Sequence, residues 1–201
     1  MLKKEDNGEF YFRPSSRGQD HLTLTWKFFE NNIVHIDIAE SDKAIGANIG
    51  SKLRISDEVY ENLQEIVERY ITPCNRSLRE VIQHPKFLRC QNVEELKKSI
   101  EKEKEEENSK IPYRFTILDK YPQYVVLAYI PKKEVVREFI KIKPRGYFFH
   151  HQYHYPFQNM INWFKQEFRS KDYQRYLRKA QSPQQVGAPG HKPENPSNRP
   201  M

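Results

Sequence analysis

The chain of 201 residues can hold one large domain or two of modest size, and its 37% of hydrophobic residues suffices for a packed core. No apolar run approaches the ~20 residues of a membrane span, and no signal peptide opens the chain. The chain has only two cysteines, Cys74 and Cys90, which excludes a disulfide framework and favours a reducing compartment. The net charge of +7 and the pI near 9.2 indicate an anionic partner of unspecified kind.

Two alternating segments joined by a turn begin the first half of the chain. Residues 10–13 place large apolar side chains at every second position, as a half-buried strand does. Pro-Ser-Ser-Arg-Gly at residues 14–18 is typical of a turn. Residues 21–26 predict a second strand, with Leu22, Leu24 and Trp26 on one face and three polar residues on the other. Residues 33–38 predict a third strand by the same alternation, with His35 and Asp37 at its polar positions.

A cation and two hydroxyls come together at the first turn. Arg13 ends the first strand, and Ser15, Ser16 and Arg17 follow it. The planar fork of arginine, serine hydroxyls and backbone N–H groups near a glycine are what a phosphate dianion needs. If the strands pair in order, His35 lies two strands away from Arg13 on the same side, roughly 10 Å between backbones. We therefore predict a phosphate pocket here, against the plainer alternatives of a surface arginine and a structural histidine.

The middle of the chain is predominantly helical in its pattern. A short strand at residues 53–55 precedes a helix that we expect to begin at Ser56, a capping hydroxyl followed by two acids. Apolar residues at helical spacing extend it to Tyr70, and Pro73 is expected to end it. A shorter helix stops before Pro85, and another begins near Val93. Seven acids against four lysines at residues 94–107 indicate a solvated helix face, not a nucleic-acid-binding one.

The second half is dense with strand candidates. We expect strands at residues 113–118, 124–130, 135–142 and 147–155, with a turn at residues 144–146. Pro156 begins an amphipathic helix that contains Phe157 and Phe164. Helix, strands and helix thus repeat the order of the first half, which predicts an α+β fold made of two copies of one unit. Residues 182–201, rich in Pro, Gly, Ser and Asn, predict a disordered tail.

The first half resembles a known family. Phe10-x-x-Arg13 before a Ser-rich loop, with His35 on the third strand, resembles the Src-homology-2 (SH2) domain. The segment RPSSRGQDHLTLTWK, followed by HIDI, is similar to the tandem SH2 module of Spt-family transcription elongation factors and histone chaperones. The resemblance runs from about Gly8 to Phe168. It implies two SH2-like domains, each a small antiparallel sheet flanked by helices, packed as one module. Their ranges would be residues 1–91, without the first strand and most of the first helix, and residues 92–181.

The resemblance also implies a function. It is that of a nuclear, monomeric phosphopeptide-binding module, with no cofactor, no membrane and no enzymatic activity. The implied partner is the phosphorylated linker or C-terminal region of the largest RNA polymerase II subunit. A second phosphate site is implied at Lys86 and Lys165, which from the residues alone are lysines near helix ends. Asp37 stands where SH2 domains of tyrosine kinases commonly carry a cation, which favours phosphothreonine or phosphoserine over phosphotyrosine.

Other motifs do not indicate chemistry. Cys74 and Arg79 are one residue short of the C-x5-R loop of phosphatases. His150 and His154 would share a face of the predicted strand and His151 would not, and no cysteine or acidic cluster lies near them, so we expect no metal site. The alternative function is a basic module with nucleic-acid contacts, which the charge of +7 and the abundant aromatic residues support. An enzyme ranks third.

Overall fold

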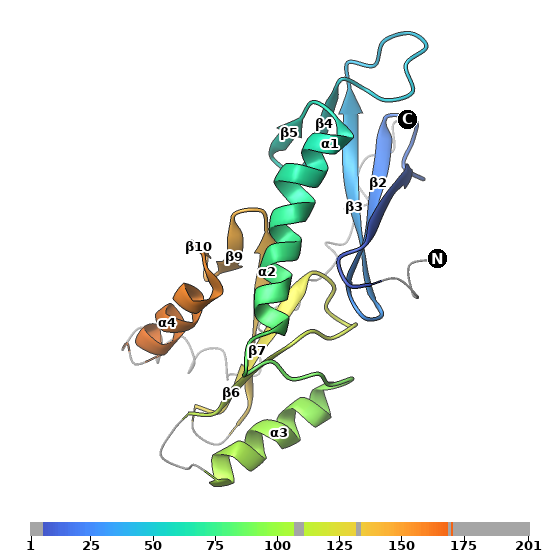
Figure 1. The fold of residues 1–201 in the computed structure, drawn as a ribbon. Helices are drawn as coiled ribbons and strands as arrows, with labels where there is room; N and C mark the ends of the chain where they lie inside the picture. Colours follow the sequence, from blue (N-terminus) through green and yellow to red (C-terminus); the bar gives the residue numbers. More distant parts are fainter. Residues whose placement is uncertain (1–5, 107–110, 132–133, 169, 171–201) are drawn as a thin grey trace, which may run out of the picture. The chain divides into compact units, whose positions relative to one another are not determined.

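The structure is a computed structural model that describes residues 6–106, 111–131, 134–168 and 170 (Figure 1). The chain divides into two compact units, Met1–Met160 and Ile161–Met201. Both β-sheets lie in the first unit, and helix α4 (Phe157–Glu167) continues into the second. The predicted tail at residues 182–201 lies outside the described residues. Among the described residues, no helix combines the length and the apolar character that a membrane crossing requires.

The first half folds into a five-stranded antiparallel sheet in the order β1-β2-β3-β4-β5. Its strands are β1 (Phe10–Pro14), β2 (His21–Phe29), β3 (Asn32–Ser41), β4 (Lys52–Ile55) and β5 (Glu58–Tyr60). The predicted strands at residues 10–13, 21–26, 33–38 and 53–55 are confirmed. Alternation buries one face, which includes Leu24, Trp26 and Ile36. The other face carries Arg13 beside Thr23, and Thr25 beside His35.

One helical segment follows, made of α1 (Leu63–Ile66), a π-helical turn η2 (Val67–Ile71) and α2 (Thr72–Ile82). The predicted start at Ser56 is wrong, because Ser56 lies in a turn with φ of 52° and the next residues pair with β4 as β5. Asn62 caps the helix instead, with its side chain accepting from the Glu65 N–H. The predicted end at Pro73 is also wrong. The Thr72 N–H donates to the Val67 carbonyl in the wider π pattern, and Pro73 occupies the first turn of α2, where its missing N–H costs little.

Asn75 on α2 fixes this helix to the first sheet. The indole N–H of Trp26 donates to Asn75 Oδ1 (2.9 Å), and Asn75 Nδ2 donates to the Gly8 carbonyl (2.9 Å). Gly8 has a φ of 96°, and a Cβ there would lie 3.0 Å from Asn75 Oδ1, so this close approach requires glycine. Helix α2 therefore packs on the Trp26 side of the sheet, opposite to the face that carries Arg13.

The second half forms another five-stranded antiparallel sheet, in the order β10-β9-β8-β7-β6. Its strands are β6 (Tyr113–Thr116), β7 (Tyr124–Tyr129), β8 (Val136–Lys143), β9 (Gly146–Phe149) and β10 (Gln152–His154). Helix α3 (Val93–Glu106) buries Leu96 and Ile100 in a core with Val126 and Ala128. A second aromatic group joins Phe157 to Phe115 and Tyr147, with ring centroids 4.9 and 4.8 Å apart. The strands predicted before residue 143 and the helices predicted near Val93 and Pro156 are confirmed.

The single strand predicted at residues 147–155 is wrong, because the chain reverses within it. His150 and His151 have φ values of 46° and 63° and connect β9 to β10 as a tight hairpin. Two successive left-handed residues usually require Asn-Gly, although histidine is one of the few other residues enriched in this conformation. The histidines therefore do not line one strand face. His150 Nε2 lies 3.2 Å from the buried carboxylate of Glu138 instead.

Helix α2 also contacts the second sheet, within the same compact unit. The Tyr147 hydroxyl lies 2.7 Å from the Ser77 carbonyl and 3.0 Å from Glu80 Oε2. Glu80 accepts a further hydrogen bond from the Phe157 N–H (3.0 Å). Burial, reinforced by the Glu80 charge, raises the pKa of Tyr147, so the hydroxyl stays a protonated donor. These contacts confirm that the two sheets pack as one module.

The linker after α2 lies along the edge of the second sheet. The Phe115 N–H donates to the Lys86 carbonyl (3.0 Å), and the Leu88 N–H donates to the Phe115 carbonyl (2.8 Å). Phe87 and Phe115 thereby form a parallel bridge. Because β6 is an edge strand, this pairing satisfies backbone groups that no other strand reaches.

Candidate functional site

Arg13 lies on the polar face of the first sheet without a neutralising partner. Its side chain is half-buried, and its contacts are long: Nε donates to Thr25 Oγ1 (3.3 Å) and Nη1 to the Pro14 carbonyl (3.4 Å). Within the described part of the chain, no carboxylate forms an ion pair with it. A guanidinium with unused donors and an uncompensated charge is ready to bind an anion bidentately.

Thr25 connects Arg13 to His35. Its hydroxyl lies 3.0 Å from His35 Nδ1 while it accepts from Arg13, so the three side chains form a row across β1, β2 and β3. The structure thus brings Arg13 and His35 to the same face, as the strand pairing predicted. Thr25 is buried and His35 exposed, which leaves Nε2 of the imidazole at the surface. Sequence reasoning missed Thr25 as a site residue, although it lies at a polar position of the middle strand between the two.

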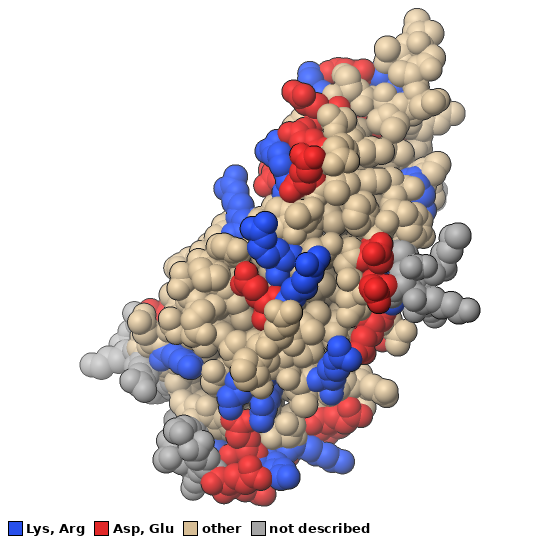
Figure 2. Space-filling view, in the orientation of Figure 1, with Lys and Arg blue, Asp and Glu red and all other residues tan. Residues whose placement is uncertain are grey.

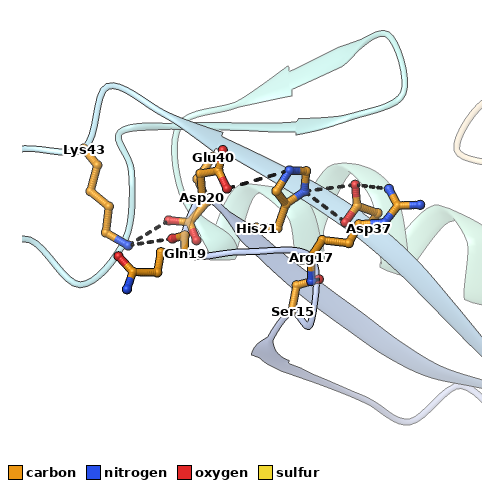
Figure 3. A network of polar contacts seen from close by, with 8 residues as sticks. All are labelled: Ser15, Arg17, Gln19, Asp20, His21, Asp37, Glu40 and Lys43. Atoms are coloured by element: carbon orange, nitrogen blue, oxygen red, sulfur yellow. Dashed lines mark hydrogen bonds and ion pairs between the residues drawn. The ribbon is translucent and has the colours of Figure 1, made fainter. Parts of the chain in front are cut away.

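Arg17, in the loop after β1, differs from Arg13 because it forms an ion pair with a carboxylate. Ser15 Oγ accepts from the Arg17 N–H (3.2 Å), which shapes the turn, and Ser16 is exposed beside it. Arg17 Nη1 pairs with Asp37 Oδ2 at 3.0 Å (Figure 3). Arg17 therefore points to Asp37 of β3.

Asp37 is the centre of a polar network on this face. Besides Arg17, it contacts His21, whose Nδ1 lies 3.1 Å from Oδ1 (Figure 3). Thr23 lies between Asp37 and Arg13 in the strand register, so the two charged residues are two strands apart. The acid does not face Arg13 as a bare charge, because Arg17 compensates it. This pairing reduces the net negative charge that Asp37 presents on this face.

The two lysines of the predicted second site lie on different elements. Lys86 lies in the linker, where Nζ forms an ion pair with Glu103 of α3 and lies 5.4 Å from the centroid of the Tyr113 ring. Arg114 joins this cluster, with Nη2 at 2.7 Å from Glu103 Oε2. Lys165 is exposed on α4 and belongs to the second compact unit. The pairing of Lys86 with Lys165 stays a prediction, and Arg114 is a cation that sequence reasoning did not include.

The motif that mimics a phosphatase loop is part of a helix. Cys74 and Arg79 both lie on α2, and Cys74 is buried. Burial raises the pKa of the Cys74 thiol, so it stays protonated and is not a nucleophile. Among the described residues, no group of three His, Cys, Asp or Glu side chains is placed to hold a metal ion.

The surface charge is mixed. On the face drawn in Figure 2, Lys and Arg side chains of the described residues are interspersed with Asp and Glu. Ion pairs between exposed side chains also occur, such as Lys52 with Asp42 at 2.7 Å and Lys97 with Glu101 at 3.8 Å. On this face the Lys and Arg side chains of the described residues do not form one continuous stripe.

Comparisons with known proteins identify the family of the chain. A model of the SH2 domain family matches residues 1–167. The chain is 35% identical over 174 residues to the transcription elongation factor SPT6 of Drosophila melanogaster, which covers 84% of this chain. It is 34% identical over 153 residues to the SPT6 homolog of Arabidopsis thaliana, which covers 74% of this chain. The chain spans only about a tenth of each relative, 10% and 9% of their lengths.

Two solved structures share the fold. One is a tandem SH2 domain of the transcription elongation factor Spt6 that binds the phosphorylated RNA polymerase II C-terminal repeat domain. Its TM-score is 0.77 at 26% identity, over 86% of this chain and 89% of that one. The other is the tandem SH2 pair of Spt6 from Antonospora locustae, with a TM-score of 0.68 at 21% identity, over 82% and 84% of the two chains. The second likeness concerns the fold alone.

Proposed function

Because the chain belongs to the SH2 domain family, we propose that it is a phosphopeptide-binding tandem SH2 module with Arg13 at the centre of its first pocket. Ser15, Ser16 and His35 would add donors around the phosphate, and Arg17 would contribute if it leaves Asp37. The single observation that carries this proposal is the uncompensated guanidinium of Arg13 in a row with Thr25 and His35. We propose that the module binds its ligand and does not catalyse a reaction.

The partner follows from the likeness to the Spt6 structure. That protein binds the phosphorylated C-terminal repeat domain of RNA polymerase II. We propose the same class of ligand for this chain, namely the phosphorylated linker or C-terminal region of the largest polymerase subunit. Docking there would hold a transcription elongation factor and histone chaperone on the transcribing polymerase, in the nucleus.

The proposed division into domains places one SH2 fold in residues 1–91 and a divergent one in residues 92–181. Each of the two sheets falls within one of these ranges, which supports the boundary in the linker after α2. Helix α3 begins just after this boundary and packs on the second sheet. A second phosphate site would use Lys86, in the linker between the two ranges, and Lys165 on α4, with Arg114 next to Lys86.

The experiment is a titration of the chain with matched peptides from the polymerase linker, phosphorylated and unphosphorylated, followed by fluorescence anisotropy. We expect binding to require the phosphate. The Arg13→Ala variant should lose roughly thirtyfold in affinity or more, because removing one partner of a charged hydrogen-bonded pair costs about 2–5 kcal/mol.

The matched control is Arg76→Ala, which removes an exposed arginine from α2 on the other side of the sheet and should bind normally. Equal affinities for phosphorylated and unphosphorylated peptides, with tighter binding to RNA and a steep salt slope, would favour a nucleic-acid-binding module instead.

A further inference from the structure

A pocket of about 280 Å³ lies between two hairpin turns of the first compact unit. One wall is the β4–β5 turn with Asp57 and Glu58, and the other is the β8–β9 turn with Lys143 and Arg145. We name it the hairpin pocket. Its lining shares no residue with the surroundings of Arg13. Its volume is close to the lower end of the ~300–1,000 Å³ of ligand pockets, which suits one or two side chains better than a nucleotide.

The second wall concentrates positive charge. Lys141 and Lys143 lie two residues apart on β8, so both side chains project from the same face of the strand, and Arg145 follows in the turn. Burial and the neighbouring charge of Lys143 lower the pKa of Lys141. In the described ranges, neither these lysines nor Arg145 pairs with a carboxylate. An anion bound between them would relieve both the desolvation and the mutual repulsion.

Aromatic rings position the lysines. Lys143 Nζ lies 4.9 Å from the centroid of Phe148 and 5.8 Å from that of Tyr153, and Lys141 Nζ lies 5.8 Å from that of Tyr124. Tyr70 also lines the hairpin pocket, and burial raises the pKa of its hydroxyl, which stays a protonated donor. The cations are thus held by rings that cannot neutralise them.

The first wall has the opposite sign. Asp57 and Glu58 line it, and Glu58 accepts a hydrogen bond from the Tyr60 hydroxyl (2.6 Å). Three cations therefore face two carboxylates across the hairpin pocket, without an ion pair between them among the described residues. A ligand that matches both walls carries an anionic group and, close to it, a cationic one.

We propose that the hairpin pocket binds a phosphorylated serine or tyrosine side chain of a peptide that carries a lysine or arginine next to the phosphorylated residue. The phosphate would lie at Lys141, Lys143 and Arg145, and the basic residue at Asp57 and Glu58. This site is additional to Arg13 and to the Lys86 and Lys165 pair, and it adds a preference for basic residues that neither of them explains.

The test uses the full chain labelled with ¹⁵N and short phosphoserine peptides with either arginine or glutamate after the phosphoserine. We expect saturable shifts of the amide signals of Glu58, Arg145 and Gly146 with the arginine peptide. Binding measured at these signals should be at least tenfold weaker for Lys141→Gln/Lys143→Gln. It should be unchanged for Arg137→Gln, which removes a charge from the same face of β8.

Further arms make the result decisive. Asp57→Asn should reduce the preference for the arginine peptide over the glutamate peptide by several-fold. Arg13→Ala should leave the shifts at the hairpin pocket intact, so failure of the Arg13 site and failure of this site are distinguishable. If the double variant does not give a dispersed spectrum, Lys143→Gln alone replaces it. Absence of the shifts, shifts that persist in the lysine variants, or stronger shifts with a short RNA would overturn the proposal.

Discussion

At the scale of single residues, the Thr25 hydroxyl determines how Arg13 and His35 are held. Thr25→Val keeps the branched shape but removes the hydrogen bonds to both. We expect affinity for a phosphothreonine peptide to fall about threefold to tenfold, the equivalent of one net hydrogen bond of roughly 1 kcal/mol. Thr25→Ser, which keeps the hydroxyl, should bind within about twofold of the wild type. Titrations of the three proteins decide this, and equal affinity of the valine variant would remove Thr25 from the site.

Asp37 is a second residue for which we predict an effect on ligand preference. Asp37→Lys removes the partner of Arg17 and adds a cation where other SH2 domains grip phosphotyrosine. We expect the ratio of phosphotyrosine to phosphothreonine affinity to rise several-fold, measured by competition at one salt concentration. Asp37→Asn separates the two effects, since it releases Arg17 without the new cation and should strengthen both peptides alike. A wild type that binds phosphotyrosine and ignores phosphothreonine would contradict the role given to Asp37.

At the scale of elements, α2 connects to both sheets, and Tyr147 is its hydrogen-bonded contact with the second one. Tyr147→Phe leaves the Ser77 carbonyl and Glu80 without this donor. We expect the free energy of unfolding to fall by about 1 kcal/mol and the Tm by about 2–4 °C. Tyr155→Phe, at an exposed position, is the control and should change neither. Phosphopeptide affinity at Arg13 should be the same in both variants, since α2 packs on the opposite face of the first sheet.

The elements also show where sequence patterns suffice. Alternation predicted the faces of β1, β2 and β3 because one side of that sheet is buried and the other is polar. The apolar positions of each strand therefore show which of its side chains face the core. Pro73 misled because the local rule that proline ends a helix ignores the π-helical turn before it. His150 and His151 misled because their left-handed conformation depends on the pairing of β9 with β10, and no glycine marks the turn.

The same contrast holds for the candidate site. The positions of Arg13 and His35 followed from strand pairing alone. The partners of the other cations did not, because Arg17 meets Asp37 across 20 residues and Lys86 meets Glu103 across 17. Such pairs depend on the path of a loop or the placement of a helix, and neither is encoded in a periodic pattern.

At the scale of the whole molecule, the question is whether two phosphates bind at once. If Lys86 and Lys165 form a second site, a doubly phosphorylated peptide should bind more tightly than a singly phosphorylated one, provided its linker spans both sites. Lys86→Ala/Lys165→Ala should erase this gain and leave singly phosphorylated binding at Arg13 unchanged. Lys97→Ala/Lys102→Ala removes two exposed lysines of α3 and serves as the control. A gain that survives the first double variant would exclude this pair as the second site.

The linker covers part of one edge of the second sheet. An edge strand with unpaired backbone groups is a template for any other chain with a free strand. Residues 86–88 occupy this template at Phe115. A cut after residue 91 would leave residues 86–88 on the first fragment, and the edge strand β6 of the second fragment would be exposed. We therefore expect the second repeat, produced alone, to associate through an exposed edge strand that the linker covers in the intact chain.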